Sequence, residues 1–241
     1  MNKIAMRRII IFCISSFLIV PLLSAEPVLR EKTVVSSFST SIAHQSNDVK
    51  HNITLACGKL NGVRIGAGRT FSFNDTVGEG SAKNGYVDGA VLYQDGIVME
   101  PGGGLCQVSS TLFNAFLLSG FSIVERHRHY QPVTYVPLGL DATIKYGKKD
   151  LKMKNVSDQD VVISVSLNNA SCTILIYGTS KLNNSYNLET EEDEISLPFS
   201  EEKENIRPGI EVYVYRNKLK DDKVIERFLL YKDFYPPVYI K

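Results

Sequence analysis

The chain has 241 residues, of which 44% are hydrophobic and 22% are charged, and this composition is typical of a globular protein with one main domain. Its formal net charge of +1 excludes the strongly basic surface of a nucleic-acid-binding protein, so no nucleic-acid partner is expected. The apolar content is sufficient for a sizeable buried core, and clues to function must therefore come from local motifs.

The first 25 residues have the pattern of a secretory signal. Lys3 and Arg8 belong to a basic start, an apolar run follows over 9–23, and small residues end at Ala25. The run is shorter than the ~20 apolar residues that a membrane-spanning helix needs. We therefore expect residues 1–25 to be cleaved as a signal peptide or kept as an N-terminal membrane anchor. Either outcome makes the protein extracytoplasmic, secreted or attached at the cell envelope.

Beyond the signal region the chain contains Cys57, Cys106 and Cys172. In a compartment where disulfides form, an odd number of cysteines leaves at least one thiol unpaired. Cys57 lies on the apolar stripe of an expected helix, where a cysteine usually serves as a small core residue. The sequence leaves open whether Cys57 pairs with Cys172.

Residues 26–180 alternate helical and strand patterns, as in a single α+β domain. Apolar spacing at i, i+4 and i+7 predicts a helix over 48–60, capped at Asn47 or Asp48, and a second helix is expected over 107–118. Short alternating runs predict strands within 63–98 and over 33–38, 122–125, 133–136, 142–146, 161–167 and 173–177. Short turns join these strands, so the predicted fold is α+β with predominantly antiparallel strands.

Two further segments complete the chain. Residues 181–205 are polar and rich in acidic side chains, which is typical of a solvated loop or linker. Residues 206–241 contain two alternating runs, 209–215 and 224–231, separated by charged turn residues. This pattern predicts a C-terminal hairpin.

The strongest chemical signal is the loop before the second helix, Gly102-Gly103-Gly104-Leu105-Cys106-Gln107. Glycines permit positive φ angles and let a ligand approach the backbone, and the first turn of a helix presents unpaired N–H groups with a partial positive charge. A thiol in this position is expected to have a lowered pKa, and the nearby N–H groups are expected to hold an acyl oxyanion. Cys106 is therefore a candidate acyl-transfer nucleophile, with an inert buried thiol as the alternative.

Two histidines downstream are candidate partners of this thiol. His127 and His129 share one face if their segment is a strand. Either one would serve as a general base, or both would bind a transition metal with Cys106, as in a zinc hydrolase. Asp141 is the leading candidate for orienting an imidazole, and Arg126 is a candidate for binding a substrate carboxylate.

The chain also resembles a known family, the VanW-like domain proteins of Gram-positive cell envelopes and glycopeptide-resistance clusters. The resemblance runs from about Asn52 to Asn155 and rests on an ordered series of matches: Phe71-Ser72-Phe73-Asn74, Gly78, Gly85-Tyr86, Ala90, Gly102 to Ser109, Thr111-Leu112, Asn114-Ala115, Glu125-Arg126, His129, Tyr135, Gly139 and Asp141-Ala142-Thr143. The family pattern has its histidine at position 129 and is variable at 127. The resemblance therefore favours His129 as the partner of Cys106 and weakens the metal site.

The resemblance implies an enzyme of peptidoglycan metabolism, because VanW-like domains have been associated with L,D-transpeptidase activity. Cys106 would form a thioester with a stem peptide, His129 would transfer protons, and Asp141 would orient His129. The expected contacts of the substrate and its oxyanion are Gly103, Gly104, Gln107, Arg126, Asn74 and Tyr86. Peptidoglycan stem peptides are the expected partners, and no cofactor is expected.

Three other outcomes stay open at this stage. A non-catalytic envelope module would bind a muropeptide or glycopeptide carboxylate at the same helix start. An L,D-carboxypeptidase would use the same nucleophile with water as the acceptor. A metal-dependent hydrolase would require His127 and His129 to converge on one ion.

Overall fold

The computed structural model describes residues 33–93, 96–182, 184–195 and 206–239. All described residues belong to one compact unit, Glu31–Lys241. The expected signal peptide or anchor over 1–25 lies outside the described residues. Among the residues that are described, no helix has the length and apolar content needed to cross a membrane.

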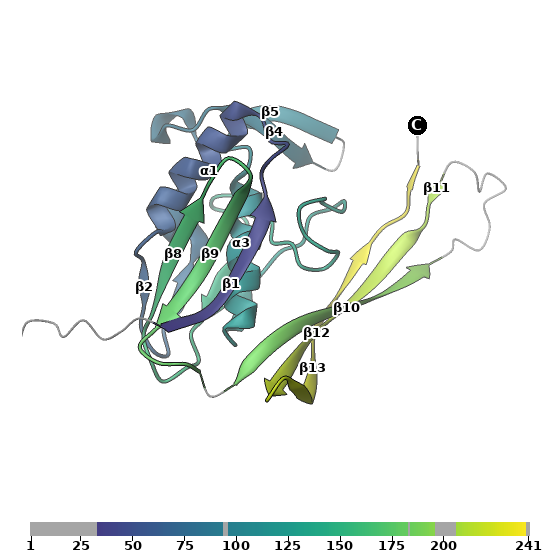
Figure 1. Ribbon diagram of the computed structural model, residues 1–241. Coiled ribbons are helices and arrows are strands. Elements are labelled where there is room, and N and C mark those ends of the chain that lie inside the picture. The colour runs from purple at the N-terminus through teal and green to yellow at the C-terminus, as the bar shows by residue number, and fades with distance from the viewer. Residues whose placement is uncertain (1–32, 94–95, 183, 196–205, 240–241) are drawn as a thin grey trace, which may run out of the picture. The chain divides into compact units, whose positions relative to one another are not determined.

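The main sheet of this unit has four antiparallel strands in the order β1-β9-β8-β2 (Figure 1). Their bounds are Thr33–Ser41, Ser171–Gly178, Val161–Leu167 and Arg64–Ile65. Every second residue of β9 is buried, including Cys172, Ile174 and Ile176, as expected when one face of a sheet packs on a core. The strand expected near 33–38 is confirmed as β1, at one edge of this sheet.

Two helices pack against this sheet, α1 (Asn47–Leu60) and α3 (Leu105–Leu118) (Figure 1). α1 starts where Ser46 Oγ accepts a hydrogen bond from the Val49 N–H at 3.2 Å, so the cap lies just before the predicted one. The apolar stripe of α1 is buried, as its spacing predicts. α3 is buried on nearly all sides, which makes it the central helix of the core.

Shorter elements complete the domain around α3. A three-stranded sheet has the order β3-β7-β6, with bounds Thr70–Ser72, Lys152–Lys154 and Ser122–Glu125. A separate hairpin consists of β4 and β5, with bounds Asp88–Tyr93 and Gly96–Pro101. Between these elements lie the short helix α2 (Phe73–Val77) and the 3-10 helix η1 (Ala82–Asn84). The predicted α+β class with predominantly antiparallel strands is confirmed.

The C-terminal strands form a three-stranded antiparallel sheet in the order β10-β12-β13, with bounds Ser185–Ile195, Gly209–Lys220 and Lys223–Tyr235. The predicted C-terminal hairpin is confirmed as β12 and β13. Two short strands, β11 (Ile206–Arg207) and β14 (Val238–Tyr239), pair with each other.

The prediction of a solvated loop over 181–205 is wrong for Ser185–Ile195, which form β10. Side chains that are partly covered, such as Leu188, alternate along this strand with exposed acidic ones, and this period of two suits an edge strand. Arg227 of β13 offsets the acidic repulsion by pairing with Glu189 and Glu191 at 3.0 and 2.6 Å. Charges on an edge strand also oppose pairing with another chain.

The predicted strands over 133–136 and 142–146 are wrong as well, because both segments are irregular. Backbone groups near the second segment bond to side chains of α3 and not to a neighbouring strand. Ser110 Oγ accepts from the Ala142 N–H at 2.9 Å, and Asn114 Nδ2 donates to the Leu140 carbonyl at 2.7 Å. Residues 140–142 are therefore held on the central helix while their backbone hydrogen bonds remain satisfied.

Alanine substitutions at two glycines test how closely the backbone is packed around the glycine-rich loop. A Cβ built at Gly103 would come within 2.4 Å of the Gly89 carbonyl carbon, whereas a Cβ at Gly58, on the exposed side of α1, meets nothing within 4 Å. We expect Gly103→Ala to lower the free energy of unfolding by about 3 kcal/mol and Gly58→Ala to raise it by about 1 kcal/mol. Urea denaturation of both variants measures this difference, and a Gly103→Ala protein of wild-type stability would contradict the close backbone approach.

Candidate active site

A cavity of about 680 Å³ contains the Cys106 thiol. Its walls include the β4-β5 hairpin, the glycine-rich loop, the start of α3 and residues from the irregular segments 129–135 and 143–149. The volume is in the range of sites that bind small ligands. The loop and the histidine segment that the sequence marked as chemically important thus lie in one place.

The glycine-rich loop has the backbone that its composition predicts. Gly102 and Gly104 have φ angles of 93° and 102°, a region that residues with a Cβ rarely adopt. Gly103 is packed in the interior, and Asn52 Nδ2 of α1 donates to its carbonyl oxygen at 3.0 Å. The loop is therefore fixed where it delivers Cys106 to the first turn of α3.

Cys106 is the second residue of α3 and is half-buried. Its Sγ lies 3.5 Å from Thr143 Oγ1 and 3.7 Å from the Ile144 carbonyl oxygen. These contacts place the sulfur against the irregular segment that follows Asp141.

The N–H groups around Cys106 differ in their availability. The Leu105 and Gln107 N–H groups donate to carbonyls of the preceding loop at 3.1 and 3.0 Å. Within the described part of the chain, the Cys106 N–H has no hydrogen-bond acceptor. The Gly104 N–H likewise has no acceptor among the described residues, so the Gly104 and Cys106 N–H groups can stabilise an oxyanion, whereas the Gln107 N–H is already hydrogen-bonded.

His129 and Asp141 form a close buried pair. The His129 ring Nδ1 and the His129 backbone N–H each lie 2.6 Å from Asp141 Oδ2. The two side chains are 6% and 2% exposed. With Nδ1 engaged by Asp141, the other ring nitrogen, Nε2, is free of that contact, and His129 lines the same cavity as Cys106 and lowers the pKa of its thiol. The three predicted residues are thus brought together in the order thiol, imidazole, carboxylate.

These contacts favour charged forms of all three groups. Burial raises the pKa of Cys106, but the hydrogen bond and positive charge of His129, with help from Thr143, lower it below its usual value. Burial lowers the pKa of His129, but Asp141 and Cys106 raise it to about 9. Burial raises the pKa of Asp141, but His129 and Arg126 lower it. All three shifts therefore act in the direction of a thiolate, an imidazolium and a carboxylate.

Arg126, which the sequence predicts to bind a substrate carboxylate, does not line this cavity. Its side chain is 6% exposed. Its guanidinium donates to the Gly139 carbonyl, to both the carbonyl and the carboxylate of Asp141, and to both carboxylate oxygens of Asp233. No donor remains for a ligand, and Arg126 is a buried support beneath Asp141.

Asn74 and Tyr86 also lie outside the cavity wall. Asn74 Nδ2 donates to the Lys149 carbonyl at 2.9 Å and thereby supports a residue that does line the cavity. Tyr86 is 2% exposed and belongs to the hydrophobic core, with Lys59 Nζ 4.9 Å from its ring centre. Neither side chain is placed to contact a ligand next to Cys106.

The glycines and Gln107 are placed differently from one another. Gly104 and Gln107 line the cavity, whereas Gly103 does not. The Gln107 side chain donates to the Ser41 carbonyl at 2.8 Å and accepts from Gln45 Nε2 at 2.9 Å. Its amide therefore ties α3 to the end of β1.

The metal alternative assumed that His127 and His129 share one face of a strand. β6 ends at Glu125, and both histidines lie on the irregular segment beyond it. His127 Nε2 lies 3.0 Å from Glu125 Oε1, whereas His129 is bound to Asp141. Over the described residues, no three His, Cys, Asp or Glu side chains are grouped so that they could hold a metal ion.

Three residues near the site were not singled out from the sequence for a role there. Thr143 contacts the thiol, and Tyr135 lines the cavity with its ring 6.4 Å from that of His129 in an edge-on arrangement. Both belong to the series of residues that match the family, and this match was the sequence evidence that could have indicated a role at the site. Tyr235 donates to Asp141 from 94 positions away, and no local pattern connects the two.

The thiols are expected to react at very different rates. Cys57 and Cys172 are 3% and 1% exposed, with their sulfur atoms 3.5 Å apart, whereas Cys106 faces the cavity and its pKa is lowered by His129. Iodoacetamide at pH 7 is expected to label Cys106 at least about tenfold faster than the other two, as measured by peptide mass spectrometry. Faster labelling of Cys57 or Cys172 would contradict the assignment.

The pH dependence of this labelling tests the role of Asp141. Asp141→Asn removes the charge that raises the pKa of His129, so the imidazolium no longer holds the thiolate and the midpoint of the Cys106 pH–rate profile is expected to rise. Asp160→Asn is the matched control, because Asp160 pairs with the exposed Arg64 instead. Identical profiles for Asp141→Asn and wild type would contradict the coupling.

Comparison with known proteins identifies relatives over this region. The VanW-like protein family matches residues 48–177, more than half of the chain. The uncharacterized protein YoaR of Bacillus subtilis (strain 168) is 36% identical over 133 residues, which cover 55% of this chain and 44% of that protein. The vancomycin B-type resistance protein VanW of Enterococcus faecalis (strain ATCC 700802 / V583) is 36% identical over 129 residues, which cover 52% of this chain and 46% of that protein.

The match therefore spans less than half the length of each of these two relatives. No solved structure matches the chain significantly. The matched region includes the glycine-rich loop together with Cys106, His129 and Asp141. The chain belongs to the VanW-like protein family.

Proposed function

We propose that this protein is an exported, peptidoglycan-modifying cysteine acyltransferase of the L,D-transpeptidase type, with Cys106 as the residue that forms a thioester. The observation that carries the proposal is the thiol, imidazole and carboxylate series of Cys106, His129 and Asp141 at a cavity of about 680 Å³. One relative is named as a vancomycin resistance protein. Since vancomycin is a glycopeptide directed at the cell wall, this name supports an envelope substrate.

In the acylation step, the Cys106 thiolate attacks the carbonyl carbon between an L- and a D-centre of a tetrapeptide stem. The Cys106 N–H stabilises the resulting oxyanion. The His129 imidazolium gives its proton to the departing amine as the C–N bond breaks. D-alanine leaves, and a thioester and a neutral imidazole remain.

In the second step, the amine of a neighbouring stem attacks the thioester carbonyl. The neutral His129 imidazole accepts a proton from this amine, and Cys106 leaves as a thiolate. A new peptide bond is formed, and the ion pair of the resting site is restored. If water takes the place of the amine, the same steps release a free carboxylate, which is the L,D-carboxypeptidase outcome.

Two lysines are placed to bind a substrate carboxylate, the role that the sequence predicted for Arg126. Lys145 and Lys149 belong to the cavity wall. On the β4-β5 hairpin, Tyr93 donates to Glu100 at 2.5 Å, and Lys145 Nζ lies 5.2 Å from the Tyr93 ring centre. The wall thus carries both signs of charge. A stem peptide carries carboxylates and amines, and the lysines are the groups that would bind its carboxylates.

The thioester is the direct test of this proposal. The purified protein is incubated with a synthetic disaccharide-tetrapeptide, and its intact mass and the released D-alanine are measured. Wild type is expected to gain the mass of the donor minus D-alanine, and Cys106→Ala is expected to gain nothing. Cys57→Ala is the control, because it removes a buried thiol away from the cavity and should leave the adduct unchanged.

A binding-only module gives a different result in the same experiment. Wild type and Cys106→Ala would then bind the muropeptide equally well, and neither an adduct nor free D-alanine would appear. That result would overturn the acyltransferase in favour of the non-catalytic envelope module.

Lysine recognition is tested by kinetics. Lys145→Met is expected to raise KM for the stem peptide about tenfold, because a charge-assisted hydrogen bond to a carboxylate is lost. The kcat is expected to stay within about twofold, since Lys145 does not contact the thiol. Lys148→Met is the control, because Lys148 is exposed outside the cavity wall. Equal KM values for the two variants would contradict this assignment.

A further inference from the structure

We infer that β13 of the C-terminal sheet is a built-in support of the active site, and that the Tyr235 hydroxyl is a positioning group that holds Asp141 in the orientation His129 requires. The inference rests on the Cys106, His129 and Asp141 arrangement behind the proposed function, but not on the identity of the acyl donor. β13 lies beyond the family match, which ends at residue 177.

Tyr235 reaches Asp141 from the covered face of its sheet. The Tyr235 oxygen accepts from the Gly139 N–H at 3.1 Å and lies 2.8 Å from Asp141 Oδ1. Because an ionised carboxylate has no proton to donate, the hydroxyl is the donor in the second contact. Tyr235 is 2% exposed, so this hydrogen bond is shielded from water.

Two other residues of β13 also support the segment that contains Gly139 and Asp141. Tyr231 donates to the Gly139 carbonyl at 2.7 Å. Asp233 accepts from Arg126 Nη1 with both oxygens, at 2.8 and 2.6 Å, and Arg126 in turn donates to Asp141. Residues 231, 233 and 235 are spaced by two, so they lie on the same face of the strand. One strand face therefore contacts Gly139 and Asp141 directly through Tyr231 and Tyr235, and it reaches Asp141 through Arg126 from Asp233.

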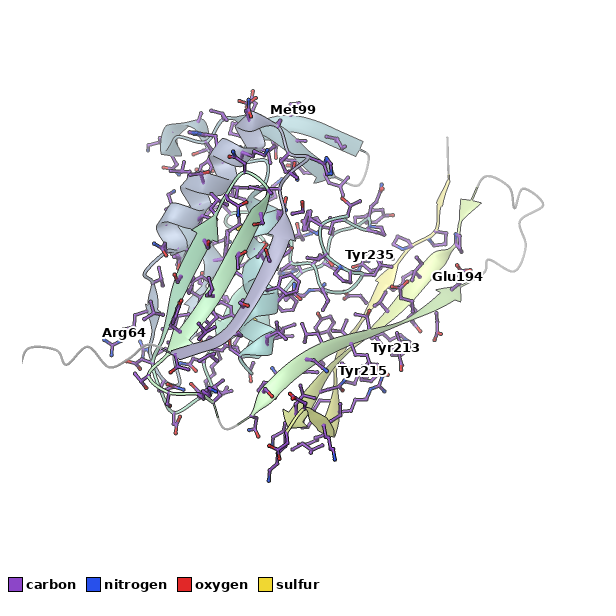
Figure 2. All side chains as sticks on the ribbon, viewed as in Figure 1. Arg64, Met99, Glu194, Tyr213, Tyr215 and Tyr235 are labelled. Atoms are coloured by element: carbon purple, nitrogen blue, oxygen red, sulfur yellow. The ribbon has the colours of Figure 1, made fainter. Side chains whose placement is uncertain are left out.

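A tyrosine on the opposite face of the same sheet, Tyr213, can be compared with Tyr235. Tyr213 of β12 pairs in register with Lys232, so it lies on the other face from Tyr235. Figure 2 shows Tyr213 and Tyr235 on neighbouring strands of the C-terminal sheet, with Tyr235 on the side of the irregular segments. The Tyr213 hydroxyl donates to Glu211 at 2.8 Å and has no contact with the site. The two tyrosines therefore differ in partner while sharing a sheet.

The two oxygens of Asp141 have different donors, and the donors to Oδ1 fix the orientation of the carboxylate. Oδ2 accepts from the ring and the backbone of His129, and Oδ1 accepts from Arg126 and Tyr235. A carboxylate rotates readily about its terminal bond. Donors on Oδ1 oppose this rotation and keep Oδ2 on the imidazole, as groups behind a metal-binding histidine do.

The hydroxyl of Tyr235 is uncharged, so its removal leaves the surrounding charges in place. The titratable and charged side chains that face it are Asp141, Arg126, Asp233, Tyr231, Tyr135 and Arg128. A change in Cys106 ionisation after loss of this hydroxyl therefore reports the orientation of Asp141 rather than a change in net charge.

The test compares Tyr235→Phe with Tyr213→Phe in the full chain, using the rate of Cys106 alkylation by iodoacetamide between pH 5 and pH 10. In Tyr235→Phe the rate at pH 6 is expected to fall about three- to tenfold, because the imidazolium holds the thiolate less well. At pH 10, where the thiol ionises unaided, the rate is expected to stay within about twofold of wild type. Tyr213→Phe is expected to reproduce the wild-type profile.

A folded Tyr235→Phe protein with the wild-type profile would overturn the inference. If Tyr235→Phe does not fold, as judged by circular dichroism, Tyr231→Phe decides: a smaller fall at pH 6 supports the role of β13, and an unchanged profile overturns it. Because alkylation needs no peptide substrate, this result is independent of the thioester test. A shifted profile without any D-alanine release would keep the inference and reject the proposed reaction.

In the stem-peptide assay, a positioning role predicts a lower kcat at unchanged KM for Tyr235→Phe, since Tyr235 is not among the residues that line the cavity. A general loss of structure would instead reduce the active fraction without shifting the pH profile. A raised KM with unchanged kcat would contradict the role.

Discussion

The contact between Asp141 and His129 is the interaction on which the site depends. It directs one ring nitrogen of His129 toward the thiol, and it supplies the negative charge that keeps the imidazole protonated beside Cys106. A buried carboxylate is costly unless its oxygens are hydrogen-bonded. The Asp141 carboxylate meets this condition because its oxygens accept four hydrogen bonds, two from His129 and one each from Arg126 and Tyr235.

The central helix connects this contact to the core. α3 carries Cys106, the proposed nucleophile, at its start and, further along, Ser110 and Asn114, which hold the segment around Asp141. Polar side chains inside a central helix normally weaken a core. Here they fix an irregular segment whose backbone would otherwise lack partners, so the spacing between thiol and carboxylate is set by one rigid element.

The parts of the fold that follow from local rules were predictable. Period-two and period-3.6 spacing identified α1, α3 and most strands, and the glycine triplet located the site, because positive φ angles at Gly102 and Gly104 are a local requirement. Side chains whose partners lie far along the chain were not predictable. From its sequence context Arg126 is expected to be a ligand-binding residue, and only the fold shows that Asp233 lies beside it. The acidic segment of β10 is expected to be a loop, and only the fold shows that Arg227 pairs with its carboxylates.

The central claim is that His129 is held as an imidazolium by Asp141 on one side and the Cys106 thiolate on the other. The most direct measurement is the titration of the His129 ring by NMR in wild type and in Cys106→Ser. We expect the ring in wild type to lose its proton near pH 9, and we expect this midpoint to fall when the thiolate is removed. A ring that titrates near pH 6.5 in both proteins would show that Asp141 and Cys106 do not hold His129 as an imidazolium.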